Sequence, residues 1–366
     1  MRRMSSLAAA QTLTSDTDAQ IDAERPPARH GESEIVNDVH ARLNATRVRT
    51  CVEVRSVADA REAILGAAPG RSICIAGGRH AMGGQQFLED GILLDTRHFD
   101  RVLTLDLQCG TVEVEAGIQW PALIQQLGEL QRGRSVPWTI RQKQTGADRL
   151  SVGGSLSSNV HGRGLTMRPI IDDVESFTLI DSHGDVRRCS RTENQELFRL
   201  AVGGYGLFGF IATVALRLLP RRRLRRVVDI VTTDRLVRAF EECIAAGCLY
   251  GDFQFAVDPG SPDFLRRGIL SAYLPIEHGR RPRDGGLALT TDQWRQLLFL
   301  AHVDKSQAFA LYAAHYLATS GQEYWSDMHQ LSFYLDDYHA QVDARLAAHG
   351  YQDAGTEVIT ELFVPM

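Results

Sequence analysis

The sequence has few lysines, no long apolar run and no paired cysteine motif, and each absence excludes a class of protein. Only Lys143 and Lys305 are lysines, so the remaining 38 of the 40 basic residues are arginines, a bias typical of a GC-rich genome. The formal net charge of −5 gives no reason to expect a nucleic-acid partner. No apolar run approaches the roughly twenty residues that a membrane span requires.

Six cysteines are scattered along the chain, and no two form a C-x-x-C pair. Most lie in apolar, strand-like stretches, so we expect reduced and partly buried thiols, as in a cytoplasmic protein. No cluster of His, Cys and Asp has the spacing of metal ligands. The patterns G-x-x-x-x-G-K-[ST] and G-x-S-x-G are also absent, so a P-loop nucleotide site and hydrolase chemistry have no support.

Length and composition indicate a globular protein of two domains. The chain has 366 residues, of which 44% are hydrophobic and 23% charged. Residues 1–33 show no periodicity and are too polar for a secretory signal, so we expect a flexible leader. Residues 34–220 carry strand and helix patterns that favour an α+β domain over a doubly wound sheet. A second domain, with more aromatics and built on a sheet, is predicted over 221–366.

Local patterns predict several elements. Ser56 is a helix N-cap before 57–68, where apolar positions recur at helical spacing. The apolar run at 72–76 predicts a strand buried on both faces. Two strand patterns flank 182–185 and predict a hairpin. The stretch V-I-T-E-L-F-V-P at 358–365 is a strand pattern with no closing helix, so we expect the second domain to be incomplete at its C-terminus.

Three glycine-rich segments stand out, at 76–86, 145–164 and 203–209. The last contains G-x-G-x-x-G, but a predicted helix precedes it and a strand follows, the reverse of the order in an NAD-binding Rossmann site. Glycines allow close backbone approach to a ligand, and successive N–H groups form a nest for phosphate oxygens. Three such segments favour a large phosphate-bearing cofactor. The alternative is a set of tight turns in a compact sheet domain.

The motifs G-G-R-H-A-M-G-G-Q, S-V-G-G-S-L-S-S-N-V-H-G-R-G and A-V-G-G-Y-G-L-F-G-F-I-A-T-V-A-L-R-L occur in this order. Their order resembles the FAD-binding domain of the vanillyl-alcohol oxidase type, also called the PCMH type. The patterns are similar to those of decaprenylphosphoryl-ribose oxidase, aldonolactone and alditol oxidases, and cytokinin dehydrogenase. The resemblance covers about residues 35–220 and becomes thin beyond 225. It implies FAD as the cofactor, held by a PCMH-type domain that a sheet-based substrate domain follows.

The resemblance places cofactor-binding residues in all three segments. Backbone N–H groups of the first would hold the FAD phosphates, and Ile211 would contact the adenine end through its backbone. His161 would hydrogen-bond the flavin or fill a turn. The implied cofactor-binding residues are Gly77, Gly78, Arg79, His80, Ala81, Met82, Gly83, Gly84, Gln85, Gly146, Ser151, Gly153, Gly154, Ser158, His161, Gly162 and Ile211.

His80 lies five residues before Gln85, and so does the histidine of cytokinin dehydrogenase that bonds covalently to the flavin methyl carbon. The resemblance therefore implies a covalent tether at His80. Arg79 and Ala81 depart from the glycine and serine usual beside that histidine. A gap-free alternative pairs the loop with that of decaprenylphosphoryl-ribose oxidase, which binds FAD without a covalent bond. Both alternatives remain open at this point.

Oxidation of an alcohol by hydride transfer to a flavin needs a base that accepts the hydroxyl proton. We expect it in the stretch at 324–339, with Tyr334 and His339 as the predicted catalytic residues. Tyr334 and Tyr338 would share a helix face, and Asp327 and His329 are further candidates. The alternative is an amphipathic segment whose aromatic side chains belong to the core.

These features predict an FAD-dependent oxidoreductase that oxidises a C–OH bond, or a C–N bond, of a small polar or sugar-like substrate. Oxygen or an electron carrier would take the electrons, and no metal, nucleic acid or membrane span is expected. Proteins of this type usually run on past 366 residues, so a truncated flavin-binding protein without turnover is the alternative. A non-flavin scaffold with glycine-rich turns is a third possibility.

Overall fold

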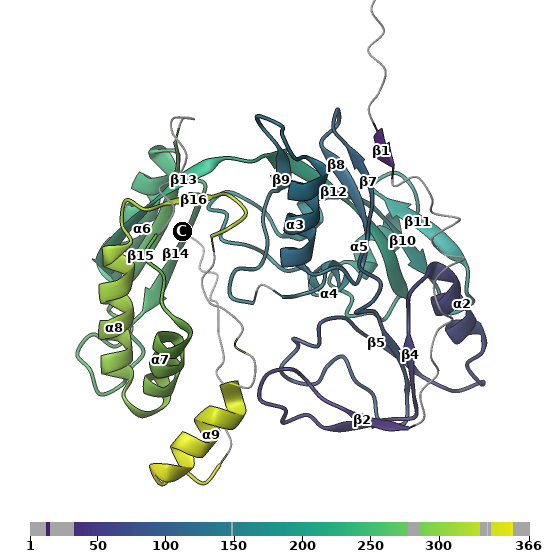
Figure 1. Cartoon of the computed structure of the whole chain (residues 1–366), viewed down its shortest axis with the longest axis horizontal. Helices are drawn as coiled ribbons and strands as arrows, with labels where there is room; N and C mark the ends of the chain where they lie inside the picture. Colours follow the sequence, from purple (N-terminus) through teal and green to yellow (C-terminus); the bar gives the residue numbers. More distant parts are fainter. Residues whose placement is uncertain are drawn as a thin grey trace, which may run out of the picture.

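The computed structural model describes residues 12–14, 33–147, 149–276, 286–329, 335 and 338–353. Within these residues the strands form four sheets, three before residue 221 and one after it. Figure 1 shows the two groups side by side, joined where β12 (Phe210–Pro220) leads into β13 (Arg223–Thr232). The combination of helices with largely antiparallel sheets is the α+β class that the sequence predicts.

A small parallel sheet of order β4-β6-β5 carries the first glycine-rich segment. The helix after β4, α2 (Val57–Leu65), begins at Ser56, whose Oγ accepts the Asp59 N–H at 3.1 Å, so the predicted N-cap is confirmed. The strands of this sheet and of the hairpin-like pair before it are β2 (Glu34–Val36), β3 (Thr46–Val48), β4 (Thr50–Glu53), β5 (Ile73–Ala76) and β6 (Ile92–Asp95).

The strand predicted at 72–76 is present as β5, but its burial on both faces is wrong. β5 is the edge strand of its sheet and pairs with β6 alone. Ile73, Cys74 and Ile75 are only partly buried, and only Ala76 is fully so. Ile73 and Ile75 pack on one core cluster, and Cys74 and Ala76 on another, but the strand also borders a cavity, described below, which leaves it partly open.

The largest sheet is built around β12, which pairs antiparallel with β8 on one side and β10 on the other. β10 and β11 form the predicted hairpin. Helix α3 lays Trp120, Leu123 and Leu127 against this sheet, all almost fully buried, and each contributes roughly 1.5–3 kcal/mol by burial. Thr12–Thr14, inside the expected leader, form β1 and pair with β7. The other elements of this region are β7 (Val102–Asp106), β8 (Thr111–Glu115), α3 (Trp120–Leu130), β9 (Trp138–Ile140), α4 (Val152–Ser157), the 3-10 turn Ile170–Asp172, β10 (Val174–Ile180), β11 (Val186–Ser190) and α5 (Gln195–Ala201).

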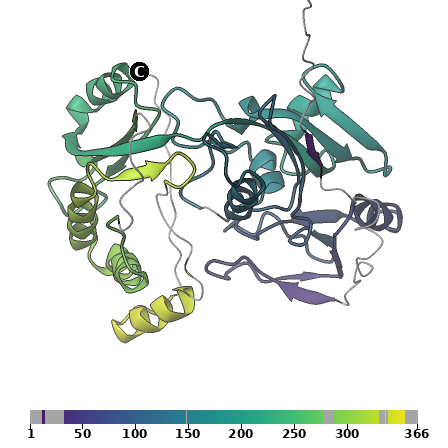
Figure 2. The same ribbon diagram turned by 45° about the horizontal axis from the view of Figure 1, so that its top comes forward.

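The second group is an antiparallel sheet of order β14-β15-β13-β16 with helices packed on it. Ala313 and Tyr316 of α8 pack against Val228 and Ile269 of the sheet. Helix α9 packs on α7, and Figures 1 and 2 both show it at the margin of the molecule. The elements are α6 (Thr233–Ala245), β14 (Tyr250–Phe255), β15 (Arg267–Ile276), α7 (Thr291–Val303), α8 (Lys305–Ala318), β16 (Glu323–Trp325) and α9 (Tyr338–Ala348).

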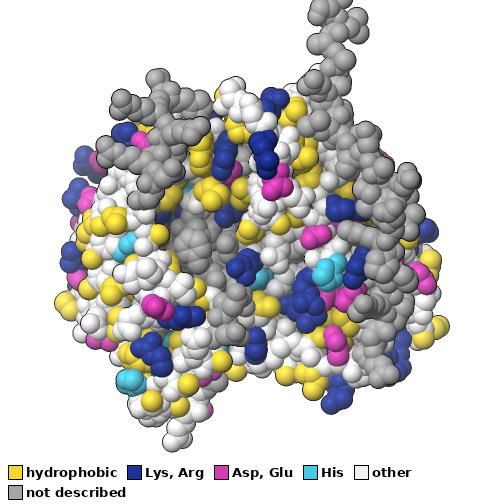
Figure 3. All heavy atoms as spheres, in the orientation of Figure 1, with side chains coloured by type: hydrophobic (Ala, Val, Ile, Leu, Met, Phe, Trp, Pro, Cys, Tyr) yellow, Lys and Arg dark blue, Asp and Glu magenta, His cyan; other side chains and the backbone are white. Residues whose placement is uncertain are grey.

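The surface gathers no large patch of one charge on the face drawn in Figure 3, where acidic, basic and apolar side chains are intermixed. In the part of the chain that the structure describes, no helix is both long and apolar enough to span a membrane. All six cysteines are free thiols, as predicted, and Cys51, Cys189 and Cys248 are buried.

Candidate functional site

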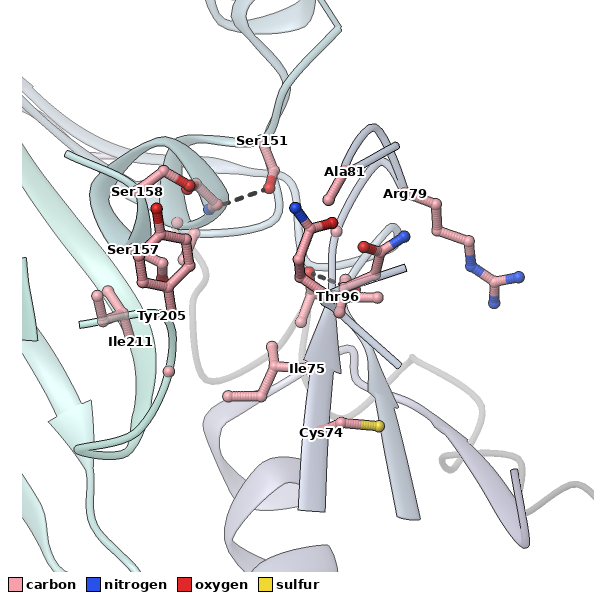
Figure 4. A pocket seen from close by; sticks show the side chains of 18 of the residues that line it. Cys74, Ile75, Arg79, Ala81, Thr96, Ser151, Ser157, Ser158, Tyr205 and Ile211 are labelled. Atoms are coloured by element: carbon pink, nitrogen blue, oxygen red, sulfur yellow. Dashed lines mark hydrogen bonds between the residues drawn. The ribbon is translucent and has the colours of Figure 1, made fainter. Parts of the chain in front are cut away.

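A cavity of about 550 Å³ lies between β5, the start of β12 and helix α4. All three glycine-rich segments contribute to its wall, although they are far apart in the sequence. Figure 4 shows Tyr205, Ile211 and Ser158 at one side of the cavity and Ala81 and Arg79 at the other. Its volume is within the range of about 300–1,000 Å³ usual for small-molecule and cofactor sites.

The first predicted loop divides into a part that faces the cavity and a tip that does not. The residues of this loop that line the cavity are Gly77, Gly78, Arg79, His80, Ala81 and Gln85. The remaining three, Met82, Gly83 and Gly84, form hydrogen bonds with other residues of the chain instead. The Met82 carbonyl accepts the Asn44 side-chain amide at 2.6 Å, the Gly83 N–H donates to Gln85 Oε1 at 3.0 Å, and the Gly84 N–H donates to the Ala81 carbonyl at 3.3 Å.

Residues 37–44 hold this loop in place, a contact that the sequence patterns did not predict. The buried Asp38 carboxylate accepts the N–H groups of His40 and Arg42 and the Asn44 side-chain amide. The Val39 N–H then donates to the Arg79 carbonyl at 3.1 Å. The Arg79 backbone has φ 58°, and its guanidinium pairs with the buried Asp95 carboxylate at 2.7 Å. The peptide around His80 is therefore fixed from two directions.

His80 is a partly buried imidazole at the cavity wall. Its Nδ1 lies 3.2 Å from Nε2 of His40, and the two rings meet edge to face. Burial, followed by the charges of His40 and Arg149, lowers the pKa of His80 to about 4. The ring is therefore neutral near pH 7, and a neutral imidazole nitrogen carries the lone pair that a nucleophile needs.

The second predicted segment also divides. Ser151, Gly153, Gly154 and Ser158 line the cavity, and Ser151 Oγ accepts the Gly154 N–H as the N-cap of α4. Three predicted residues of this segment do not line the cavity. They are Gly146, His161 and Gly162. The Gly146 N–H donates to the Gln144 side chain and the Gly162 N–H to the Gln142 side chain, and the His161 ring contacts the Gly162 carbonyl at 3.0 Å.

The third segment contributes more than the sequence predicts. Ile211 lines the cavity as expected, and so do five neighbours that were not singled out, namely Tyr205, Gly206, Leu207, Gly209 and Phe210. The G-x-G-x-x-G pattern lies after α5 and before β12, so the reversed order that argued against a Rossmann site is confirmed. The place of Phe210 directly before the predicted Ile211 could have indicated it, but no local pattern indicates the exposed side chains of Tyr205 and Leu207.

Gln86 is a further cavity residue that the sequence analysis missed. Both amide atoms of its side chain are buried, and neither has a hydrogen-bond partner among the described residues. Burying an unpaired amide is costly, so the cavity fits a ligand that offers both a donor and an acceptor. Backbone loops suited to phosphate, apolar walls and this amide together match the parts of a flavin dinucleotide.

Of the two predicted catalytic residues, the structure describes only His339. Tyr334 lies outside the described residues. His339 lies on α9 beside Tyr338, and it is not among the residues that line the cavity. Tyr338 belongs to the core between α7 and α9. Asp327 is buried in an ion pair with Arg221, and His329 is buried with its Nδ1 2.8 Å from Arg163.

Metal ligation has no support in the described part of the chain, where no three His, Cys, Asp or Glu side chains gather to hold an ion. That no metal is bound stays a prediction, and it depends on the spacing of these residue types in the sequence.

Comparison with known proteins identifies the region around the cavity. Residues 48–190 match the FAD binding domain family. The chain is 32% identical over 192 residues, half of its length, to an uncharacterized oxidoreductase (ORF5 in the fasciation locus) of Rhodococcoides fascians. It is 28% identical over 209 residues, 55% of its length, to cytokinin dehydrogenase 3 of Arabidopsis thaliana. It is also 28% identical over 171 residues, 46% of its length, to the L-gulonolactone oxidase of Bos taurus.

These matches cover 42%, 38% and 37% of the three relatives' own lengths, so the chain matches less than half of each. The match to the FAD binding domain and the alignments with the relatives agree with the family resemblance found in the sequence motifs. Residues 48–190 are therefore identified as an FAD-binding domain of the PCMH type, and this part of the chain is similar to FAD-binding oxidoreductases.

Proposed function

We propose that this protein is an oxidoreductase that holds FAD in the cavity and oxidises a C–OH bond of a small polar or sugar-like substrate. The observation that carries the proposal is the cavity of about 550 Å³ that the three glycine-rich segments line within an FAD-binding domain. L-gulonolactone oxidase and cytokinin dehydrogenase are named for unlike substrates. A C–N bond is therefore the alternative point of oxidation.

In this proposal the chain binds FAD mainly through its backbone. The N–H groups of residues 78–81 would meet the phosphates, since these residues line the cavity and glycine loops suit anions. Ser151 and Ser158 would add hydroxyl groups, and the Gln86 amide would pair with a polar edge of the cofactor. FAD, when bound, supplies a ring that accepts a hydride from the substrate. The chain holds that ring and excludes water.

We further propose that His80 forms a covalent bond to the flavin methyl carbon. The neutral imidazole, its place at the cavity wall and the contact with His40 support this bond. The new N–C bond replaces one N–H and one C–H bond, so two electrons and two protons leave. Dioxygen, reduced to hydrogen peroxide, would take them. The imidazole proton would pass first to Nε2 of His40 and from there to the peroxide.

The substrate would lie between the FAD-binding domain and the sheet of residues 221–366, which we propose as a substrate domain following the domain at 34–220. Tyr334 and His339 remain the predicted catalytic residues. Oxygen or an electron carrier would reoxidise the cofactor. A cytoplasmic location is part of the proposal and is supported by the six free thiols.

The test is a visible spectrum of the purified protein, followed by acid precipitation. We expect flavin absorption bands, and yellow colour in the pellet if His80 is the tether. His80→Ala should move the colour to the supernatant, whereas His183→Ala, at a ring that is 83% exposed, should not. Colour released from both the parent protein and His80→Ala would leave FAD binding intact and refute the tether.

Turnover needs a separate measurement. Reduction of an artificial electron acceptor should follow addition of an alcohol, a sugar or a sugar lactone to the flavin-loaded protein. Turnover only with amines would move the reaction to a C–N bond. Bound flavin without turnover on any of these substrates would favour a flavin-binding protein that does not react, and a colourless protein that takes up no FAD would refute the proposal.

A further inference from the structure

The loop at 203–209 carries two large apolar side chains that are not part of any core. Tyr205 is 70% exposed and Leu207 is 84% exposed, yet both line the cavity. Tyr205 has φ 51°, in the left-handed region that an aromatic residue rarely adopts. An exposed aromatic side chain in an unfavourable backbone conformation gains nothing for the fold by itself. Such positions gather at binding sites.

The base of this loop is firmly held, so the position of Tyr205 is defined. The Tyr205 N–H donates to the Ser157 carbonyl at 3.0 Å, and the Gly203 N–H donates to the Leu156 carbonyl at 2.9 Å. Both acceptors belong to α4, the helix at the cavity. Figure 4 shows the Tyr205 ring beside Ser157 and Ser158 and near Ile211. The ring therefore borders the cavity without filling it.

This end of the cavity has the character of a slot for a flat ring. Its apolar walls come from β5, from the loop and from the start of β12. A side chain at Gly206 would come within 3.7 Å of the Ile75 methyl group, so the loop closely approaches β5 at this point. The apolar residues that line this end are Ile73, Ile75, Tyr205, Leu207, Phe210 and Ile211. Such walls suit a planar heteroaromatic ring, which gains most when an aromatic side chain stacks on it.

FAD has two ring systems, and the course of β12 indicates which one belongs here. β12 begins with Phe210 and Ile211 at the cavity and ends at Pro220, from which the chain enters β13. Its nine residue steps beyond Ile211 span roughly 30 Å at about 3.3 Å per residue. The ring that exchanges electrons must meet a substrate held between the two regions. The end of the cavity at Tyr205 is far from the second region along β12, so we assign it to the adenine ring.

We propose that Tyr205 stacks on the adenine ring, with Leu207 at its edge, and that this loop makes the protein select FAD over FMN. The proposal rests on the proposed function and extends it to a residue that sets cofactor specificity. It requires no change in the fold, because the loop base on α4 stays as it is.

The test compares affinities for FAD and FMN in apoprotein, all in a His80→Ala background so that binding stays reversible. Tyr205→Asn removes the ring but tolerates the left-handed backbone, and Tyr205→Phe keeps the ring. Tyr351→Asn is the matched control at an exposed tyrosine, 47% accessible, that does not line the cavity. Dissociation constants come from quenching of flavin fluorescence, with ADP as a competitor.

We expect Tyr205→Asn to raise the FAD dissociation constant about tenfold or more, since loss of base–aromatic stacking has effects of this order. The FMN constant should stay unchanged, ADP should compete less well, and Tyr205→Phe and Tyr351→Asn should resemble the parent. Unchanged FAD affinity in Tyr205→Asn, or equal loss of FAD and FMN affinity, would overturn the proposal. Failure of the parent to bind either flavin would overturn the proposed function and this inference with it.

Discussion

At the scale of single residues, the partly buried His80 and the buried His329 should make this protein sensitive to acid. Burial lowers the pKa of His80 to about 4, and burial together with the Arg163 charge lowers the pKa of His329 well below its usual value. In the unfolded chain both rings have a pKa of about 6.5. The unfolded state therefore binds more protons than the folded state as the pH falls below about 6.5.

The free energy of unfolding should thus fall as the pH is lowered from about 6.5 towards 4. Urea denaturation at about pH 7.5 and about pH 5 would measure the difference. His80→Asn should show a smaller difference than the parent, while His183→Asn, at an exposed ring, should match the parent. A stability that rises on acidification, or a His80→Asn difference equal to that of the parent, would contradict the assignment of His80 as a partly buried neutral imidazole.

At the scale of elements, α4 and its N-cap bring the second glycine segment to the cavity. A side chain at Gly154 would meet only Ser151 Oγ, at 3.0 Å, before entering the cavity. At Gly153 it would instead meet the Ala116 side chain at 2.9 Å and disturb the packing. Position 154 is therefore the place to fill the cavity while leaving the fold intact.

Gly154→Val should abolish FAD retention and leave the thermal unfolding of the apoprotein within a few degrees of the parent. Gly128→Val is the control, because Gly128 lies on α3 with no atom within 4 Å of an added Cβ. It should retain FAD, as judged by the ratio of flavin to protein absorbance. Full retention in Gly154→Val would count against the placement of the cofactor.

Local patterns predicted the elements better than the site. Ser56 and the helix after it, and the hairpin around 182–185, depend on neighbouring residues, so the sequence alone predicts them. An apolar run such as 73–76 predicts a strand, but it does not distinguish a strand that faces core from one that faces a cavity. The contact of His40 with His80 joins residues forty positions apart, so no local periodicity in the sequence can predict it. Tyr205 is the first x of the G-x-G-x-x-G pattern, a position at which the pattern specifies no residue type.

At the scale of the whole molecule, buried polar contacts join the FAD-binding domain to the second sheet. Arg163, within the second glycine-rich segment, pairs with Asp252 of β14 at 2.6 Å, and both side chains are largely buried. The Tyr250 hydroxyl donates to the Arg141 carbonyl, and the Thr139 hydroxyl to the Asp327 carboxylate, each at 2.6 Å. The two regions are therefore held in a fixed relation by several directional bonds.

Asp252→Asn should lower the free energy of unfolding by about 3–5 kcal/mol, because it leaves the buried Arg163 guanidinium without its counter-charge. Glu242→Gln, which breaks the exposed pair with Arg238 on α6, should cost less than about 1 kcal/mol. Urea unfolding curves of both variants would measure the two losses. Losses of equal size would show that Arg163 and Asp252 act as an ordinary surface pair.

The place of β12 in the largest sheet limits how the protein can be divided. The segment that matches the FAD binding domain family ends at residue 190, whereas β12 occupies the position between β8 and β10. A fragment cut at 190 would leave both neighbours with an open edge of unpaired N–H and C=O groups. Open strand edges of this kind pair with other chains and cause aggregation. A soluble fragment for crystallisation or isotope labelling must therefore extend at least to Pro220.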